Sequence, residues 1–73
     1  MQVTIRFANN ASEAVDRALG CVLLTTEAAT ARHLIGGFYF ETKRDMAQII
    51  AAFEEEGFEP ASDFDNIEFD WRS

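Results

Sequence analysis

Apolar residues recur along this chain at two different spacings, and each spacing predicts a different kind of element. They alternate with polar residues over residues 2–7 and again over residues 66–72, which predicts a half-buried strand at each place. An aromatic-rich run over residues 38–41 follows two glycines and predicts a third strand. Alternate side chains of each strand are expected to face the core and the opposite side of the sheet.

The segment after the first strand predicts a helix, because apolar residues repeat at helical spacing over residues 11–23. Two interpretations compete after Leu19. Either Gly20 ends the helix and residues 21–26 form a strand, or the helix continues, with or without a kink, through residues 27–34 to the following glycine pair. We favour helix for residues 27–34, because Ala-Ala-Thr-Ala is poor turn chemistry.

A further helix is expected over residues 43–56. Its apolar stripe consists of Met46, Ile49, Ile50 and Phe53. Thr42 stands three residues before Asp45, which predicts a capping box at the start of this helix. Gly57 is well placed to end it as a left-handed residue.

Together these elements predict a single α+β domain over residues 1–73. Helices would cover one face of a small sheet of three or four strands in a two-layer sandwich. If residues 21–26 form a strand, the order is βαββαβ, the ferredoxin-like arrangement. Otherwise a three-stranded sheet carries one long or broken helix and one shorter helix.

Negative charge is concentrated in one part of the chain. The sequence has 13 acidic and 6 basic residues, for a net charge of -7. The first 53 residues contain five of each, whereas residues 54–73 contain eight acidic residues and one arginine. Because phosphate groups attract lysine and arginine, direct binding to nucleic acid or to an anionic membrane is not expected.

Residues suited to catalysis or metal binding are sparse. Cys21 and His33 are each the only residue of their kind, and no catalytic signature surrounds them, so no enzymatic activity is expected. Cys21 is expected in the core and His33 at a partly exposed helix end. Residues 63–68 are rich in oxygen ligands but break the EF-hand pattern, so no metal site is expected. The glycine motifs of nucleotide-binding loops are absent, and no cofactor is expected.

The expected location is the cytoplasm. No basic segment followed by an apolar one opens the sequence. The longest strongly apolar run covers only residues 21–24, far fewer than the ~20 residues that span a bilayer. A single cysteine cannot form an internal disulfide, so nothing indicates an oxidising compartment.

The charges of the helix expected over residues 43–56 oppose its dipole. Lys43 and Arg44 stand at the positive end, partly offset by Asp45, and three consecutive glutamates at 54–56 stand at the negative end. Each misplaced exposed charge costs about 0.3–1 kcal/mol. A pattern that folding alone does not favour indicates a functional surface. The competing explanation is that acidic residues keep a small protein soluble and protect edge strands.

Our preferred hypothesis is a small non-catalytic interaction protein that presents carboxylates and aromatic rings to a basic surface of a partner protein. Nucleic-acid-binding proteins have the most common strongly basic surfaces, so the chain would inhibit such a partner by phosphate mimicry. Phage and mobile-element antagonists of host nucleases, including anti-CRISPR and anti-restriction proteins, often share this size and acidity, which is a likeness of bulk properties. The residues expected to contact the partner are Glu54, Glu55, Glu56, Glu59, Asp63, Asp65, Glu68 and Asp70, with Tyr39 and Phe58 as aromatic anchors.

The alternative hypothesis is a ferredoxin-like regulatory module. In that case the chain forms a homodimer and binds a small molecule between its subunits. This function requires an apolar, self-complementary sheet edge or helix face and does not need the acidic residues.

Overall fold

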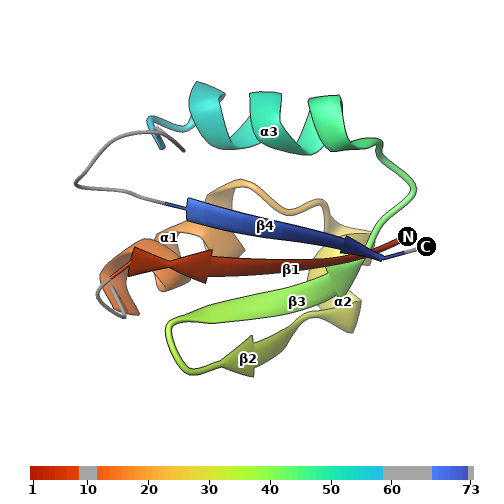
Figure 1. The fold of residues 1–73 in the computed structure, drawn as a ribbon. Coiled ribbons are helices and arrows are strands. Elements are labelled where there is room, and N and C mark those ends of the chain that lie inside the picture. Colours follow the sequence, from red (N-terminus) through yellow and green to blue (C-terminus); the bar gives the residue numbers. More distant parts are fainter. Residues whose placement is uncertain (9–11, 59–66, 73) are drawn as a thin grey trace.

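The computed structural model describes residues 1–8, 12–58 and 67–72. Its elements, in chain order, are β1 (Gln2–Phe7), α1 (Ser12–Cys21), α2 (Thr25–Thr30), β2 (Arg32–Leu34), β3 (Gly37–Glu41), α3 (Met46–Glu55) and β4 (Ile67–Arg72). The strands form one sheet in the order β2-β3-β1-β4, in which every neighbouring pair is antiparallel (Figure 1). The α+β class predicted from the sequence is confirmed.

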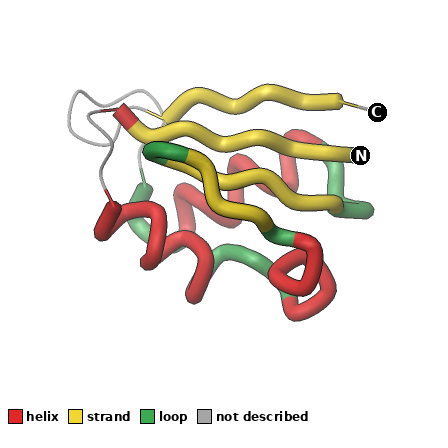
Figure 2. The backbone as a smooth tube through the Cα atoms, turned by 90° about the horizontal axis from the view of Figure 1, so that it is seen from below, coloured by secondary structure: helices red, strands yellow, loops and turns green. Residues whose placement is uncertain are grey.

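The described helices all lie on one side of the sheet and leave its other side open (Figure 2). Alternation within the strands explains this, because one set of side chains faces the helices and the next set faces away. The large side chains that are fully buried between the layers are Phe38, Phe40, Phe53, Phe58, Ile5, Ile49 and Val3. Phe7 joins them, with its ring centre 5.8 Å from that of Phe58 and 6.3 Å from that of Phe38.

The two strands predicted from alternation are present as β1 and β4, and the strand predicted from its aromatic content is present as β3. In β3, Phe38 and Phe40 are buried, whereas Tyr39 faces the open side and is half-buried. In β4, Phe69 and Trp71 lie on the helix side with their rings stacked, 5.5 Å apart and 6° from parallel. The ring of Phe53 on α3 meets Phe69 edge-on at 5.4 Å, so α3 packs against β4.

The expectations for residues 21–34 are partly wrong. Residues 21–26 contain no strand, because α1 runs to Cys21 and α2 begins at Thr25. The helix favoured for residues 27–34 stops at Thr30, and the chain turns into the short strand β2. Hydrogen bonding to the edge of β3 outweighs the helical propensity of this segment, since β2 pairs with β3 throughout its length.

The start of α3 also differs from the sequence prediction. Asp45, not Thr42, is the N-cap, and its side chain accepts a hydrogen bond from the Gln48 N–H at 2.8 Å. Thr42 is buried, and its hydroxyl donates a hydrogen bond to the Glu27 carboxylate instead. At the other end Gly57 has a φ of 89°, as expected for a left-handed residue after a helix.

Gly37 permits the close approach of β3 to β1. A Cβ atom at this position would lie 2.1 Å from the carbonyl oxygen of Ile5, which real side chains do not tolerate. The glycine is therefore required by the packing of two central strands.

We expect Gly37→Ala to lower the free energy of unfolding by about 1–3 kcal/mol, because the backbone of β1 or β3 must shift. Gly20→Ala is the matched control, since a Cβ there meets nothing within 4 Å inside α1. That variant should gain about 0.5–1 kcal/mol from helix propensity. Chemical denaturation of both variants measures the difference, and an unchanged stability of Gly37→Ala would contradict the close approach.

No helix in the described part of the chain is both long and apolar enough to cross a membrane.

Candidate functional site

The C-terminal end of α3 carries three consecutive glutamates, here called the α3 glutamates: Glu54, Glu55 and Glu56. All three are exposed. None forms an ion pair with a cation in residues 1–8, 12–58 or 67–72. They stand at the negative end of the helix dipole, where folding gains nothing from negative charge.

The positive end of α3 differs from the sequence expectation. The helix begins at Met46, so Lys43 and Arg44 precede it, and Arg44 turns away to bind Glu27. Asp45 caps the first turn favourably. Only the C-terminal half of the unfavourable charge pattern therefore remains.

Glu68 and Asp70 do not join the α3 glutamates on one face. Both are exposed on the open side of the sheet, because they alternate along β4 with Ile67, Phe69 and Trp71, which pack on the core. Glu68 lies beside Arg6 of β1 in the strand register, and the Asp70 carboxylate is 3.5 Å from the Arg72 guanidinium. Acidic and basic side chains are mixed on this face, since Arg6 and Arg72 lie beside Glu68 and Asp70, so it presents no concentrated negative charge.

Of the two aromatic anchors expected from the sequence, only one is accessible. Tyr39 is half-buried on the open side of the sheet, beside Arg32 of β2. Phe58 is fully buried in the core, and the Arg17 guanidinium lies 4.2 Å from the centre of its ring. A partner cannot contact Phe58 without opening the core. The acidic residues Glu59, Asp63 and Asp65 lie outside the described residues.

Four parts of the described chain lie toward the same end of the molecule, here called the acidic end. They are the C-terminal end of α3, the end of β1, the start of β4 and, at the opposite edge of the sheet from β4, the β2–β3 turn (Figure 1). The α3 glutamates and Glu68 thus share one end, although they project from different layers.

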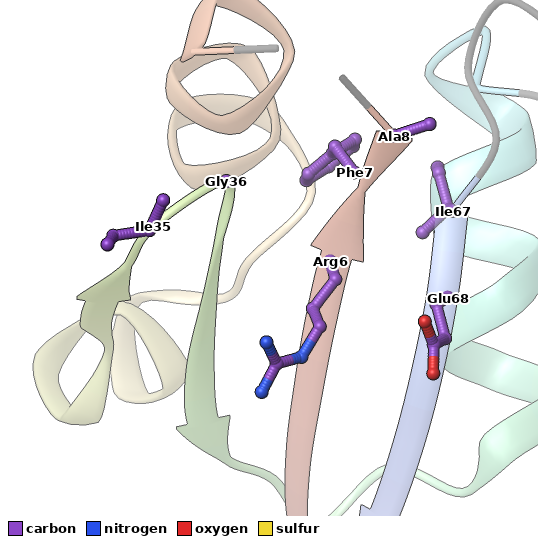
Figure 3. A pocket seen from close by; sticks show the side chains of 7 residues that line it. All are labelled: Arg6, Phe7, Ala8, Ile35, Gly36, Ile67 and Glu68. Atoms are coloured by element: carbon purple, nitrogen blue, oxygen red, sulfur yellow. The ribbon is translucent and has the colours of Figure 1, made fainter. Parts of the chain in front are cut away.

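A hollow of about 470 Å³ opens at the acidic end (Figure 3). It is lined by Arg6, Phe7, Ala8, Ile35, Gly36, Ile67 and Glu68. Ile35 at the hairpin turn is 88% exposed, more than any other large apolar side chain in the described part of the chain. The hollow therefore combines an apolar rim with one cationic and one anionic side chain.

Sequence reasoning did not identify Ile35. It stands in the segment interpreted as the end of a helix, where an isolated isoleucine carries no distinguishing signal. Its exposure arises because residues 32–34 pair with β3 and place the turn at the tip of a hairpin.

A second polar cluster surrounds Glu27 on α2, which is only 2% exposed. Its carboxylate accepts a hydrogen bond at 2.9 Å from the backbone N–H of Leu24. It also accepts one at 2.8 Å from Nε of Arg44, a second from the same guanidinium, and one from the Thr42 hydroxyl. The remaining guanidinium contact, at 3.2 Å, goes to the Val22 carbonyl oxygen.

These contacts decide the ionisation of Glu27. Burial by itself raises the pKa of this carboxyl group, but hydrogen bonds from Arg44, Thr42 and Leu24 favour the charged form more strongly. The net pKa of Glu27 lies below its ordinary value. The sequence gives a faint signal for one contact only, since a glutamate in the third position of a helix often accepts the N-cap N–H.

A second hollow, of about 600 Å³, lies next to this cluster and is bordered by Met1, Leu24 and Lys43 among others. The two acids in its lining already have cationic partners. Glu27 binds Arg44, and the Glu41 carboxylate lies 3.4 Å from the N-terminal ammonium. The cluster therefore joins α2 to the β3–α3 connection and leaves no unpaired acid in this lining.

The remaining titratable residues form no catalytic arrangement among the described residues. Cys21 is exposed at the end of α1 rather than buried, so its expected core position is wrong. His33 lies in β2 and not at a helix end. The described chain contains no group of three or more His, Cys, Asp or Glu side chains that could hold a metal ion.

No protein-family model, no curated protein and no solved structure matches this chain.

We expect Glu27→Ala to lower the free energy of unfolding by about 3 kcal/mol at neutral pH, because it leaves Arg44 partly buried without its partner. Thermal denaturation measures the loss. Glu41→Ala removes an exposed carboxylate from the same hollow and is the matched control, with an expected loss below about 1 kcal/mol. Equal losses in the two variants would contradict a structural role for the Glu27 cluster.

The pH dependence of stability provides a separate measurement. The folded pKa of Glu27 is lowered, so its charged form stabilises the fold above the unfolded value of about 4.3. This stabilisation is lost as the pH falls from that value through the folded pKa. Wild-type protein should lose more stability over this range than Glu27→Gln. Parallel pH profiles of the two proteins would show that the Glu27 cluster does not depend on charge.

Proposed function

We propose that this chain is a small non-catalytic interaction protein whose acidic end docks on a basic, nucleic-acid-binding surface of a partner protein. The single observation that carries the proposal is the exposed set of α3 glutamates at the negative end of α3, without a described cationic partner. Folding does not require these carboxylates there. A basic partner surface would stabilise all three.

The arrangement of the α3 glutamates supports a groove as the docking site. Successive helical residues are rotated by about 100°, so three consecutive carboxylates spread over more than half of the helix circumference. Clefts that bind nucleic acid carry cations along both walls of a groove. A helix end with carboxylates on several sides fits such a groove and takes the place of phosphate groups.

Ile35 replaces Phe58 as the apolar anchor in this proposal. It is exposed at the same end of the molecule, beside the hollow that Glu68 also lines. Interfaces combine charged groups that accelerate association with a few apolar contacts that supply affinity. The acidic end offers exposed carboxylates and an exposed apolar side chain at the same end of the molecule.

The proposal extends to fold family and cellular location. The antiparallel order β2-β3-β1-β4, with α1 and α2 together forming the first crossover, supports a ferredoxin-like βαββαβ arrangement. The single cysteine supports a cytoplasmic location. An inhibitor of a host nuclease, of the anti-CRISPR or anti-restriction kind, is one role that such a protein would serve.

We expect Glu54→Gln/Glu55→Gln to weaken partner binding at least tenfold while raising the free energy of unfolding by about 1 kcal/mol, because the dipole no longer opposes two charges. Affinity purification from the source cells at low and high salt identifies the partner, and binding of the purified pair is then measured. The partner should bind duplex DNA or RNA and release it when this chain is added.

Glu13→Gln/Asp16→Asn is the matched control for this experiment. It removes the same amount of charge from exposed positions on α1, a different helix from the one that carries the α3 glutamates. The control should bind the partner as wild-type protein does once the salt concentration screens long-range attraction. If both variants weaken partner binding equally, the loss comes from the net charge of the protein and not from the α3 glutamates, which would contradict the proposed docking site.

Ile35→Ser tests the apolar anchor. We expect a loss of about tenfold in affinity through faster dissociation, with little change in the association rate, because the change removes contact area and no charge. Surface plasmon resonance separates the two rates. Since Ile35 is 88% exposed, the stability of the free protein should change by less than about 0.5 kcal/mol. Unaltered dissociation would exclude Ile35 from the interface.

A further inference from the structure

Strand β4 forms one edge of the sheet and is the longer of its two edge strands. The order β2-β3-β1-β4 leaves one side of β4 without a neighbouring strand among the described residues. The other edge, β2, has only three residues, whereas β4 has six. An edge of this length offers a row of backbone groups to a further strand.

The hydrogen-bonding pattern identifies which backbone groups face outward. The Phe7 N–H donates to the Gly36 carbonyl oxygen at 2.8 Å, so the backbone of Phe7 points toward the β2–β3 hairpin. In an antiparallel ladder this direction alternates, so Arg6 and Thr4 point toward β4. Their register partners, Glu68 and Asp70, point back toward β1. The N–H and C=O groups of Phe69 and Trp71 are therefore directed to the free edge.

The side chains on the open side of β4 form a self-complementary series. Glu68 stands at one end, Asp70 in the middle and Arg72 at the other end, all three exposed. When two copies of β4 pair antiparallel about Asp70, Glu68 of each copy lies opposite Arg72 of the second copy. Directly opposed unlike charges stabilise an antiparallel pair.

The same register satisfies the outward backbone groups. Phe69 of each copy then lies opposite Trp71 of the second copy, and each such pair exchanges two hydrogen bonds. On the helix side the stacked rings of Phe69 and Trp71 meet the same two rings of the second copy. Both rings are only partly buried in the single chain, so pairing covers apolar surface.

Other registers are less favourable. Moving the two-fold axis to Phe69 places Glu68 opposite Asp70, so that like charges oppose each other twice. Moving it to Trp71 also opposes unlike charges twice, Asp70 against Arg72, but pairs only three described residues of each strand instead of five, so Phe69 has no described counterpart. The register about Asp70 opposes like charges once, at Asp70 itself, and an Arg72 guanidinium 3.5 Å away offsets that repulsion.

From these observations we propose that the chain forms a two-fold symmetric dimer in which β4 pairs antiparallel with β4 of a second copy about Asp70, joining two four-stranded sheets into one of eight. This inference does not rest on the function proposed for the α3 glutamates, because a different element carries it.

Charge reversal tests the pairing. Glu68→Arg alone and Arg72→Glu alone each place like charges opposite one another twice, so each variant should dimerise at least tenfold more weakly than wild-type protein in analytical ultracentrifugation. A mixture of the two variants restores two unlike pairs and should form a heterodimer. The reversals Glu13→Arg and Arg32→Glu, on α1 and β2, are the controls and should leave the dimer unchanged. Failure of the mixture to associate would overturn the proposed pairing.

A cysteine at the two-fold axis tests the register without relying on charge. Asp70→Cys in a Cys21→Ser background should form a disulfide-linked dimer under oxidised glutathione, because facing residues in a non-hydrogen-bonded pair have Cα atoms about 4.5 Å apart. Glu68→Cys in the same background is the matched control, since its counterpart lies opposite Arg72 instead. Efficient linkage through Glu68→Cys, or none through Asp70→Cys, would overturn the register. Partner capture through the α3 glutamates is measured separately, so either proposal can fail while the other holds.

Discussion

The buried carboxylate of Glu27 is the contact on which the helical half of this fold most depends. It accepts hydrogen bonds from Leu24, which precedes the β2–β3 hairpin in the sequence, and from Thr42 and Arg44, which follow it. It therefore holds α2 against the connection between β3 and α3. Without those donors, burial would oppose the charge of Glu27. The position of α3, and of the acidic residues at its far end, follows from where this connection begins.

The Glu27 cluster also changes the interpretation of charge in this chain. Arg44 appears, from the sequence alone, to be a cation placed unfavourably at the start of a helix. In the structure it precedes the helix and binds a buried acid, so its position has a structural cause. Such a cause is absent for the α3 glutamates among the described residues, and that contrast is why a partner is proposed for them and not for Arg44.

The two faces of the sheet divide the acidic segment in a way that composition does not reveal. Glu68 and Asp70 belong to an open face that also carries arginines, whereas the α3 glutamates lie in the helix layer. A mixed face favours contact with a copy of itself, and an unpaired acidic helix end favours a basic partner. One short chain thus presents two surfaces of different chemistry.

Local pattern was sufficient for β1, β3, β4 and most of α1 and α3, because alternation and helical spacing are set by neighbouring residues. It was insufficient for residues 21–34, where the competition between helix and strand is decided by the free edge of β3. The N-cap of α3 was misplaced for a related reason, since the hydroxyl of Thr42 is used by Glu27, which lies 15 residues earlier.

By itself, the amino-acid sequence determined the fold class, the apolar core and the location of the excess negative charge in the last 20 residues. Only the tertiary structure decided which of those charges lie together, that Phe58 is buried and that Ile35 is exposed. The physical reason is the range of the contacts involved. Hydrophobic periodicity is a local property of the chain, whereas exposure and ion pairing depend on residues that the fold brings together from distant positions.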